Sequence, residues 1–220
     1  TRITYGVLNL CHRNGHADPE PLPVGETVKV TLDLDHIAYR VPAGDRIRVA
    51  VSSAYWPLIW PSPEKTALIL SAGNVSLPVA PTAEDQWTFP EPDAAEPWKT
   101  HQRREPSHVR RVEQDQQTGL VSLVIEDDFG IVEDAGHGFF GGTIARERWT
   151  IHPDDPLSAR GACHWTDERG RGDWVVRTET RSEMWSDATH FHLHASLEAF
   201  ENDERVFSKT FKDSIARDHL

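Results

Sequence analysis

The stretch that decides the fold is Thr27-Val28-Lys29-Val30-Thr31-Leu32-Asp33-Leu34-Asp35, in which apolar and polar side chains alternate without a break. Side chains of a β-strand point alternately to the two faces of a sheet, so Val28, Val30, Leu32 and Leu34 share one face. This period of two predicts a half-buried antiparallel strand.

The same period of two recurs along most of the chain. Residues 46–53 repeat it directly after a Pro-Ala-Gly-Asp turn signal, and residues 109–114 and 120–126 repeat it on either side of Thr118-Gly119. Only one short helix is predicted, at residues 155–159, with Asp155 as its N-cap and Pro156 at its first position. Further strand patterns lie at residues 68–70, 75–79, 129–133, 143–151, 162–167, 174–183, 190–200 and 205–211.

Many short strands with at most one or two short helices predict an all-β fold, a jelly-roll β-sandwich. Residues 81–108 break the pattern with five prolines, and proline fixes φ and lacks a backbone N–H. We therefore interpret residues 81–108 as a long crossover loop. The 220 residues are predicted to form a single domain with strands in residues 1–80 and 109–220.

Composition excludes several classes of partner. The chain carries 23 Lys and Arg against 35 Asp and Glu, a net charge of −12, which disfavours nucleic-acid binding because that needs a basic face. No apolar run is long enough for a membrane helix, and no signal-peptide pattern opens the chain. We therefore expect a cytoplasmic protein without a nucleic-acid or membrane partner. Self-association is left open.

Motifs for nucleophilic or cofactor chemistry are missing. The chain contains no Gly-x-Ser-x-Gly, the strand-to-helix turn that presents the serine of α/β-hydrolases. Residues 136–141 read Gly-His-Gly-Phe-Phe-Gly, but a strand pattern follows where a dinucleotide site needs a helix, so we interpret them as a glycine-rich hairpin. We predict no catalytic residue and no cofactor in this chain.

Histidines gather in one strand pattern, His190-Phe191-His192-Leu193-His194, followed by Glu198. His192, His194 and Glu198 share a face and match the spacing of the first metal motif of cupins, which bind zinc, iron or manganese. The glycines that flank this motif in cupins are absent, and no second histidine motif follows. An outward-facing row of histidines is the favoured interpretation, and a cupin-like metal site is the alternative.

An aromatic and proline-rich segment, residues 54–64, follows one of the clearest strand patterns. It contains Tyr55, Trp56 and Trp60 among three prolines, and such a rigid apolar loop is a candidate contact surface for another domain. The eight tryptophans of the chain leave a second alternative open, a carbohydrate-binding module, because aromatic faces stack on the apolar faces of sugars.

Three segments together resemble one family. They are Gly6-Val7-Leu8-Asn9-Leu10-Cys11-His12-Arg13, residues 37–48 (Ile-Ala-Tyr-Arg-Val-Pro-Ala-Gly-Asp-Arg-Ile-Arg), and residues 55–64 (Tyr-Trp-Pro-Leu-Ile-Trp-Pro-Ser-Pro-Glu). The chain resembles the C-terminal domain of the X-Pro dipeptidyl-peptidase and cocaine-esterase-like (CocE/NonD) hydrolases over roughly residues 6–80. Beyond residue 109 the resemblance is carried by residues 155–159, 205–209 and 215–218.

The resemblance implies a galactose-binding-like jelly roll that packs on and stabilises an α/β-hydrolase domain and a helical cap of the same parent chain. In this family the Ser-Asp-His triad lies in the hydrolase domain, so no family catalytic residue has a counterpart here. The chain begins at Thr1 without methionine, which we interpret as truncation of a longer hydrolase. The resemblance also suggests that Cys11, at a position where threonine or serine is expected, is a free buried thiol.

Overall fold

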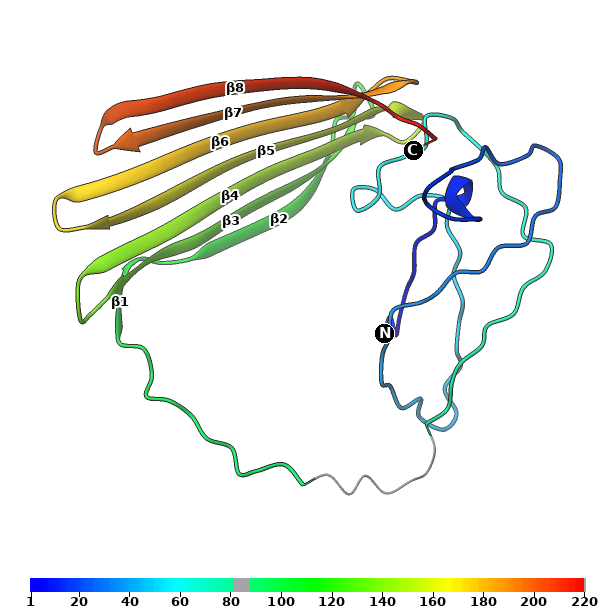
Figure 1. Ribbon diagram of the computed structural model, residues 1–220, viewed down its shortest axis with the longest axis horizontal. Coiled ribbons are helices and arrows are strands. Elements are labelled where there is room, and N and C mark those ends of the chain that lie inside the picture. Colours follow the sequence, from blue (N-terminus) through cyan, green and yellow to red (C-terminus); the bar gives the residue numbers. More distant parts are fainter. Residues whose placement is uncertain (81–87, 220) are drawn as a thin grey trace.

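The computed structural model describes residues 1–80 and 88–219, and its strands form one antiparallel sheet (Figure 1). The all-β class is confirmed, and a sheet of this kind is consistent with a β-sandwich. One short 3-10 helix, η1, spans Leu10–His12. The strands are β1 (Thr100–Arg104), β2 (Ser107–Gln114), β3 (Val121–Asp134), β4 (Phe139–His152), β5 (Asp155–Arg171), β6 (Trp174–Ser186), β7 (His190–Glu201) and β8 (Glu204–Ala216).

The order of the strands in the sheet follows their order in the chain. From β3 to β8 each strand pairs with the next through a hairpin, while β1 and β2 both pair with β3. Local turn chemistry explains these reversals. Between β2 and β3, the Asp115 carboxylate accepts hydrogen bonds from the N–H groups of Gln117 and Thr118, and Gly119 has φ +77°. The predicted hairpin at residues 109–126 is therefore confirmed.

The predicted helix at residues 155–159 is wrong, because these residues begin β5 and pair with the end of β4. Asp155 does accept a hydrogen bond from the N–H of Leu157, as an N-cap residue would. The same side-chain bond also forms an Asx turn at the start of a strand. Ser158 reinforces this turn by donating its hydroxyl to the Asp155 carbonyl and accepting the His152 N–H.

Two further predictions differ from the structure. No strand is assigned within residues 1–80, although their alternating segments are extended, because a strand also needs a neighbour that completes its ladder. The predicted crossover at residues 81–108 is partly strand, since β1 and the start of β2 lie in it, and Pro106 separates the two at the sheet edge. Residues 81–87 of that crossover lie outside the described residues.

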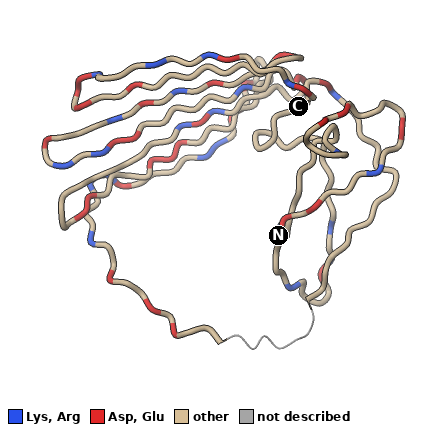
Figure 2. Tube along the Cα trace, in the orientation of Figure 1, with Lys and Arg blue, Asp and Glu red and all other residues tan. Residues whose placement is uncertain are grey.

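The two faces of the sheet differ. Residues of both charges are spread along the strands of the sheet (Figure 2). On one face, the ion-pair face, Arg111 and Arg148 both contact Glu113, and these hydrogen bonds lower the pKa of that carboxyl. The other face, which we name the loop face, carries Phe191 and Leu193 of β7, and Trp149 in β4 shares it through the strand register. Such alternation lets one face of an antiparallel sheet bind a second layer.

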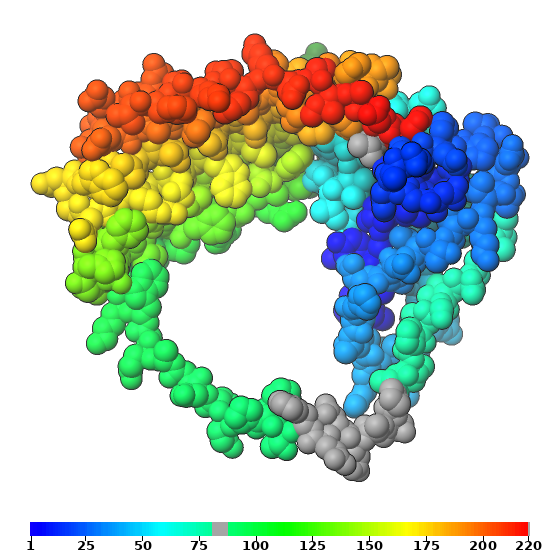
Figure 3. All heavy atoms as spheres, in the orientation of Figure 1, coloured from blue at the N-terminus to red at the C-terminus, as the bar shows by residue number. Residues whose placement is uncertain are grey.

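The buried core is small for a chain of this length. The buried apolar side chains among the described residues are those of Val124, Phe140, Ala145, Ala159 and Phe191, all in the sheet. The space-filling view shows a wide opening between the sheet, residues 88–99 and the N-terminal region (Figure 3). The surface of the chain is consequently large, 17451 Å². No helix among the described residues is long and apolar enough to cross a membrane.

Candidate functional site

The aromatic loop, residues 55–64, lies on the loop face of the sheet. The rings of Trp56 and Trp60 meet edge to face at 5.1 Å. Trp56 also packs edge to face on Trp149 of β4, and Trp60 packs edge to face on Phe191 of β7. The ring centroids are 6.0 Å apart in both pairs. Edge-to-face pairs at such distances are favourable beyond the area they bury. Four aromatic rings thus connect the loop to the sheet.

Arg217, which follows β8, fixes the loop in place. Its side chain is buried, with 3% of the residue exposed, and it donates to the Pro61 carbonyl at 2.7 Å and to the Ser186 hydroxyl at 3.0 Å. Its guanidinium also lies 4.6 Å from the centre of the Phe191 ring. Burial lowers the pKa of Arg217, but an arginine remains charged at neutral pH. A buried charge is held here by carbonyl, hydroxyl and aromatic partners.

The loop therefore has two sides. Trp56 and Trp60 are half-buried against the sheet, and the indole N–H of Trp60 donates to Ser186 at 3.1 Å. On the other side, Tyr55, Leu58 and Ile59 expose 45%, 60% and 37% of their surface. Of the predicted contact residues, Trp56 and Trp60 pack on the sheet of this chain, while Tyr55 is exposed and its hydroxyl accepts a hydrogen bond from Arg2 at 2.7 Å. Sequence reasoning missed Ser186 as the acceptor for Trp60 and Arg217 as the donor to the Pro61 carbonyl.

The predicted histidine row does lie on one face of β7, the ion-pair face, where the ring of Trp185 packs against both His192 and His194. His192 contacts Asp187 through Nε2 at 2.9 Å and the Ser214 hydroxyl through Nδ1 at 3.2 Å. His194 packs edge to face on Trp185. Glu198 accepts a hydrogen bond from Arg205 at 2.8 Å. Among the described residues, no group of three His, Cys, Asp or Glu is placed to hold a metal ion.

Ser214, His192 and Asp187 are joined by hydrogen bonds and have the residue types of a catalytic triad. The other hydrogen bonds of Asp187, however, are those of a turn. Asp187 also accepts from the N–H groups of Thr189 and His190, which closes the connection between β6 and β7. These backbone bonds, with the one from His192, lower the pKa of Asp187 far below its usual range. The carboxylate is thus held ionised as a turn anchor.

A shallow hollow of about 540 Å³ lies at the opposite end of the sheet, beside the glycine-rich hairpin that joins β3 and β4. As predicted, residues 136–141 form this hairpin and open no helix. Asp134 accepts the N–H groups of Gly136 and His137, and the indole N–H of Trp98 at 2.6 Å. The side chains that the hollow presents include Trp98, Phe129, Phe139, Thr143, Asp134 and Arg169.

Comparison with known families identifies the N-terminal half. Residues 1–113 match the model of the X-Pro dipeptidyl-peptidase C-terminal non-catalytic domain. The chain belongs to this family. No curated protein and no solved structure matches it.

The match to the X-Pro dipeptidyl-peptidase C-terminal domain covers the aromatic loop and ends inside β2, so β3–β8 lie outside it. The family description as non-catalytic agrees with the missing Gly-x-Ser-x-Gly motif. Cys11, within the match, is a free thiol and half-buried. Position 6, also within the match, requires glycine because the backbone of Asp33 packs closely against it. A Cβ at this position would lie 2.5 Å from the Asp33 carbonyl oxygen.

Proposed function

We propose that this chain is the accessory domain of an X-Pro dipeptidyl-peptidase-like or CocE/NonD acyl-esterase serine hydrolase, and that it packs on and stabilises the catalytic domain. That enzyme would act through an acyl-enzyme formed on a serine outside this chain. The chain itself supplies no nucleophile. Its contribution is to complete the fold of the parent and to form part of the wall beside the catalytic domain and its cap.

The observation that carries this proposal is the two-sided aromatic loop. Its inner side is fixed to the sheet by aromatic contacts and by the hydrogen bond from Arg217 to Pro61. Its outer side presents Tyr55, Leu58 and Ile59 to solvent on this fixed support. Apolar side chains held rigidly at a surface are typical of the buried centre of an interface. We assign the contact with the catalytic domain to this outer side.

The amount of exposed surface supports the same proposal. A compact protein of 24.8 kDa is expected to expose about 10,000 Å². This chain exposes 17451 Å², and its exposed large apolar residues include many in residues 30–79. A neighbouring domain that covers part of this surface would remove apolar area from water, which stabilises the assembly.

The first test is the coding sequence that precedes Thr1. We expect it to encode alternating strands and helices with a Gly-x-Ser-x-Gly motif at a strand-to-helix turn. A stop codon directly before this chain, or an upstream region without such a motif, would contradict the proposal.

The second test uses the extended polypeptide with Leu58→Asp. A carboxylate in an apolar interface is costly to bury, so we expect at least a tenfold loss of hydrolase activity or a lowered Tm of the catalytic domain. Val24→Asp is the matched control, because Val24 is 99% exposed in the same half of the chain. Equal hydrolase activity and equal Tm in the two variants would show that the loop is not part of the interface.

One observation favours a second candidate function, binding of a carbohydrate. The hollow beside the β3–β4 hairpin combines the aromatic rings of Trp98 and Phe139 with the polar groups of Thr143 and Arg169. Sugars bind to this combination through stacking and hydrogen bonds. Titration with neutral oligosaccharides is expected to show binding that Trp98→Ala removes. No binding of any sugar, or binding that is unchanged in Trp98→Ala, would exclude this site.

A further inference from the structure

Two histidines near the start of the chain bring the same ring nitrogen together. The Nδ1 atoms of His12 and His16 lie 2.9 Å apart, and the two rings meet edge to face with their centroids 5.1 Å apart. Without a metal ion, one of these nitrogens donates a hydrogen bond to the other, since two bare lone pairs at this distance repel. Two imidazole nitrogens that converge in this way are also the ligands that transition-metal ions take.

The spacing of the two nitrogens selects the geometry of the ion. Imidazole nitrogens bind Zn²⁺ and its neighbours in the first row at about 2.0–2.1 Å. Two such nitrogens are about 2.9 Å apart when the ligand–metal–ligand angle is 90°, and about 3.3 Å apart at the tetrahedral angle. The observed 2.9 Å therefore fits the square-planar or tetragonal coordination of Cu²⁺ and Ni²⁺ better than the tetrahedral coordination of Zn²⁺.

A closed loop holds the two rings in place. His12 is the last residue of η1, and Gly15, with φ +139°, donates its N–H to the His12 carbonyl at 3.0 Å. This backbone conformation favours glycine. Arg13 closes the loop, because it donates to the Glu20 carbonyl at 2.8 Å and forms an ion pair with the Glu20 carboxylate. Ligands that are already positioned lose little freedom when an ion binds, which strengthens binding.

Burial determines which nitrogen of His12 is available to an ion. The Nε2 atom of His12 is buried and has no hydrogen-bond partner among the described residues. An ion from solvent therefore reaches this ring through Nδ1, on the side where His16 is exposed. Binding displaces the proton between the two Nδ1 atoms, and the ring that held it then carries its proton on Nε2.

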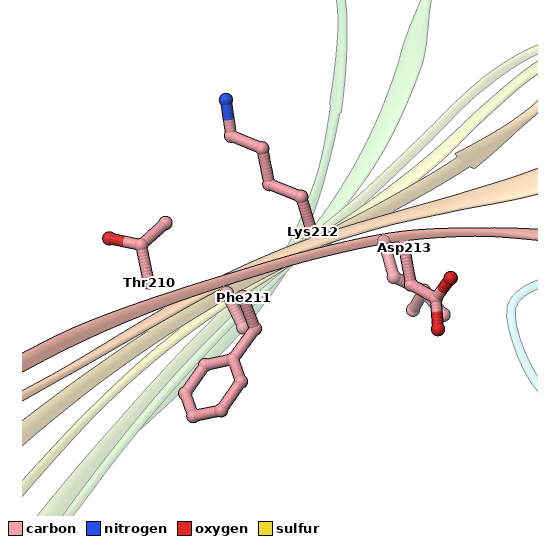
Figure 4. A pocket seen from close by; sticks show the side chains of 6 residues that line it. Thr210, Phe211, Lys212 and Asp213 are labelled. Atoms are coloured by element: carbon pink, nitrogen blue, oxygen red, sulfur yellow. The ribbon is translucent and has the colours of Figure 1, made fainter.

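The histidine row of β7 is a poorer position for a cation. Lys212 of β8 is paired in register with His194, so both residues lie on the ion-pair face. Figure 4 shows Asp213 on the other side of β8, away from Lys212. At this position β8 therefore gives the row a cation, which repels a metal ion, and directs its carboxylate to the opposite face.

We propose that His12 and His16 form a binding site for one divalent transition-metal ion, Ni²⁺ or Cu²⁺, which both Nδ1 atoms coordinate. Imidazole is a preferred ligand of both ions, and Cu²⁺ binds it most tightly among the first-row divalent ions. The acidic chain also attracts cations, since its net charge is −12. Two protein ligands leave the remaining coordination positions to water. This proposal is independent of the accessory-domain function.

The test is calorimetric titration of the whole untagged chain with Ni²⁺, which does not oxidise the neighbouring free thiol of Cys11. We expect one ion per chain and paramagnetic broadening of the amide NMR signals of residues 9–20. His16→Asn, at an exposed position, removes one ligand and is expected to weaken binding at least about tenfold. His194→Asn is the matched control, an exposed histidine of the β7 row, and is expected to leave the affinity within about twofold of wild type.

Urea unfolding of both variants checks their fold. Zn²⁺ is expected to bind wild type more weakly than Ni²⁺, because the tetrahedral angle does not fit the spacing of the two nitrogens. Tighter binding of Zn²⁺ than of Ni²⁺ would contradict the ligand angle on which the proposal rests. Absence of Ni²⁺ binding, an affinity that His16→Asn leaves unchanged, or broadening confined to residues 190–194 would overturn the proposal.

Discussion

Residues 1–80 and the sheet formed by β1–β8 share alternating apolar patterns, yet they are stabilised differently. In the sheet, hairpins bring neighbouring strands together, so every strand from β3 to β7 has a ladder on both sides. In residues 1–80, the alternating segments have no ladder, and Ile47, Val49 and Val51 remain exposed. The comparison shows that an alternating pattern supplies the face of a strand but not the partner that completes it.

Removing core side chains tests this difference with the largest expected effect. Phe140, 4% exposed, packs beneath the guanidinium of Arg103, and Phe140→Ala is expected to lower the free energy of unfolding by about 3–5 kcal/mol. Val49→Ala, at a position 61% exposed, is expected to change it by less than about 0.5 kcal/mol. Urea denaturation of the two variants measures both values. Similar losses would show that residues 1–80 are as tightly packed as the sheet.

Arg217 joins the two regions, so its replacement tests their coupling. Arg217→Met removes the donor to Pro61 and Ser186 and leaves their oxygens without this partner. We expect a loss of about 2–3 kcal/mol in the free energy of unfolding, together with faster proteolysis within residues 55–64. Arg217→Lys is the control for charge, and it is expected to recover only part of the loss because one ammonium cannot span both acceptors. Full recovery with lysine would contradict the geometry given for this residue.

Much of the sheet could be predicted from the sequence, because its reversals are local. The turn at Thr118-Gly119 and the strand patterns after residue 139 lie within a few residues of the groups that complete them. The helix predicted at Asp155 failed because one side-chain hydrogen bond begins either a helix or an Asx turn. The sequence alone does not distinguish the two, since the pairing with β4 decides.

A smaller, pH-dependent effect is expected from the turn anchor Asp187. Its pKa in the folded protein is lowered by the backbone N–H of Thr189 and by His192. An acid with a lowered folded pKa stabilises the protein above its unfolded pKa of about 4, and this contribution disappears as pH falls through the folded pKa. Asp187→Asn should therefore be less stable than wild type at pH 7, with the difference shrinking below about pH 4.

Urea midpoints at several pH values measure this difference, and Asp203→Asn, an exposed turn position between β7 and β8, is the charge-matched control. A gap between wild type and Asp187→Asn that stays constant from pH 7 into the acid range would contradict the assigned role of the carboxylate.

The candidate interface was predictable only in part. Trp56 and Trp60 stand out in the sequence because aromatic residues and prolines are concentrated there, but Arg217, which donates to Pro61 of the same loop, lies 156 residues beyond it. No local pattern connects residues so far apart. The histidine row shows the reverse case, since its common face followed from the period of two, while the partners Asp187 and Ser214 depended on the turn and on β8.

Hydrogen exchange of backbone amides, compared between this chain alone and the polypeptide extended by the sequence encoded before Thr1, tests the central claim most directly. We expect the amides of β4–β6 to exchange slowly and equally in both, because their ladders are complete within this chain. Residues 55–64 and the alternating segments before them should be at least about tenfold more protected in the extended polypeptide. Equal exchange of residues 27–64 in the two proteins would contradict the claim that this half of the chain binds a catalytic domain.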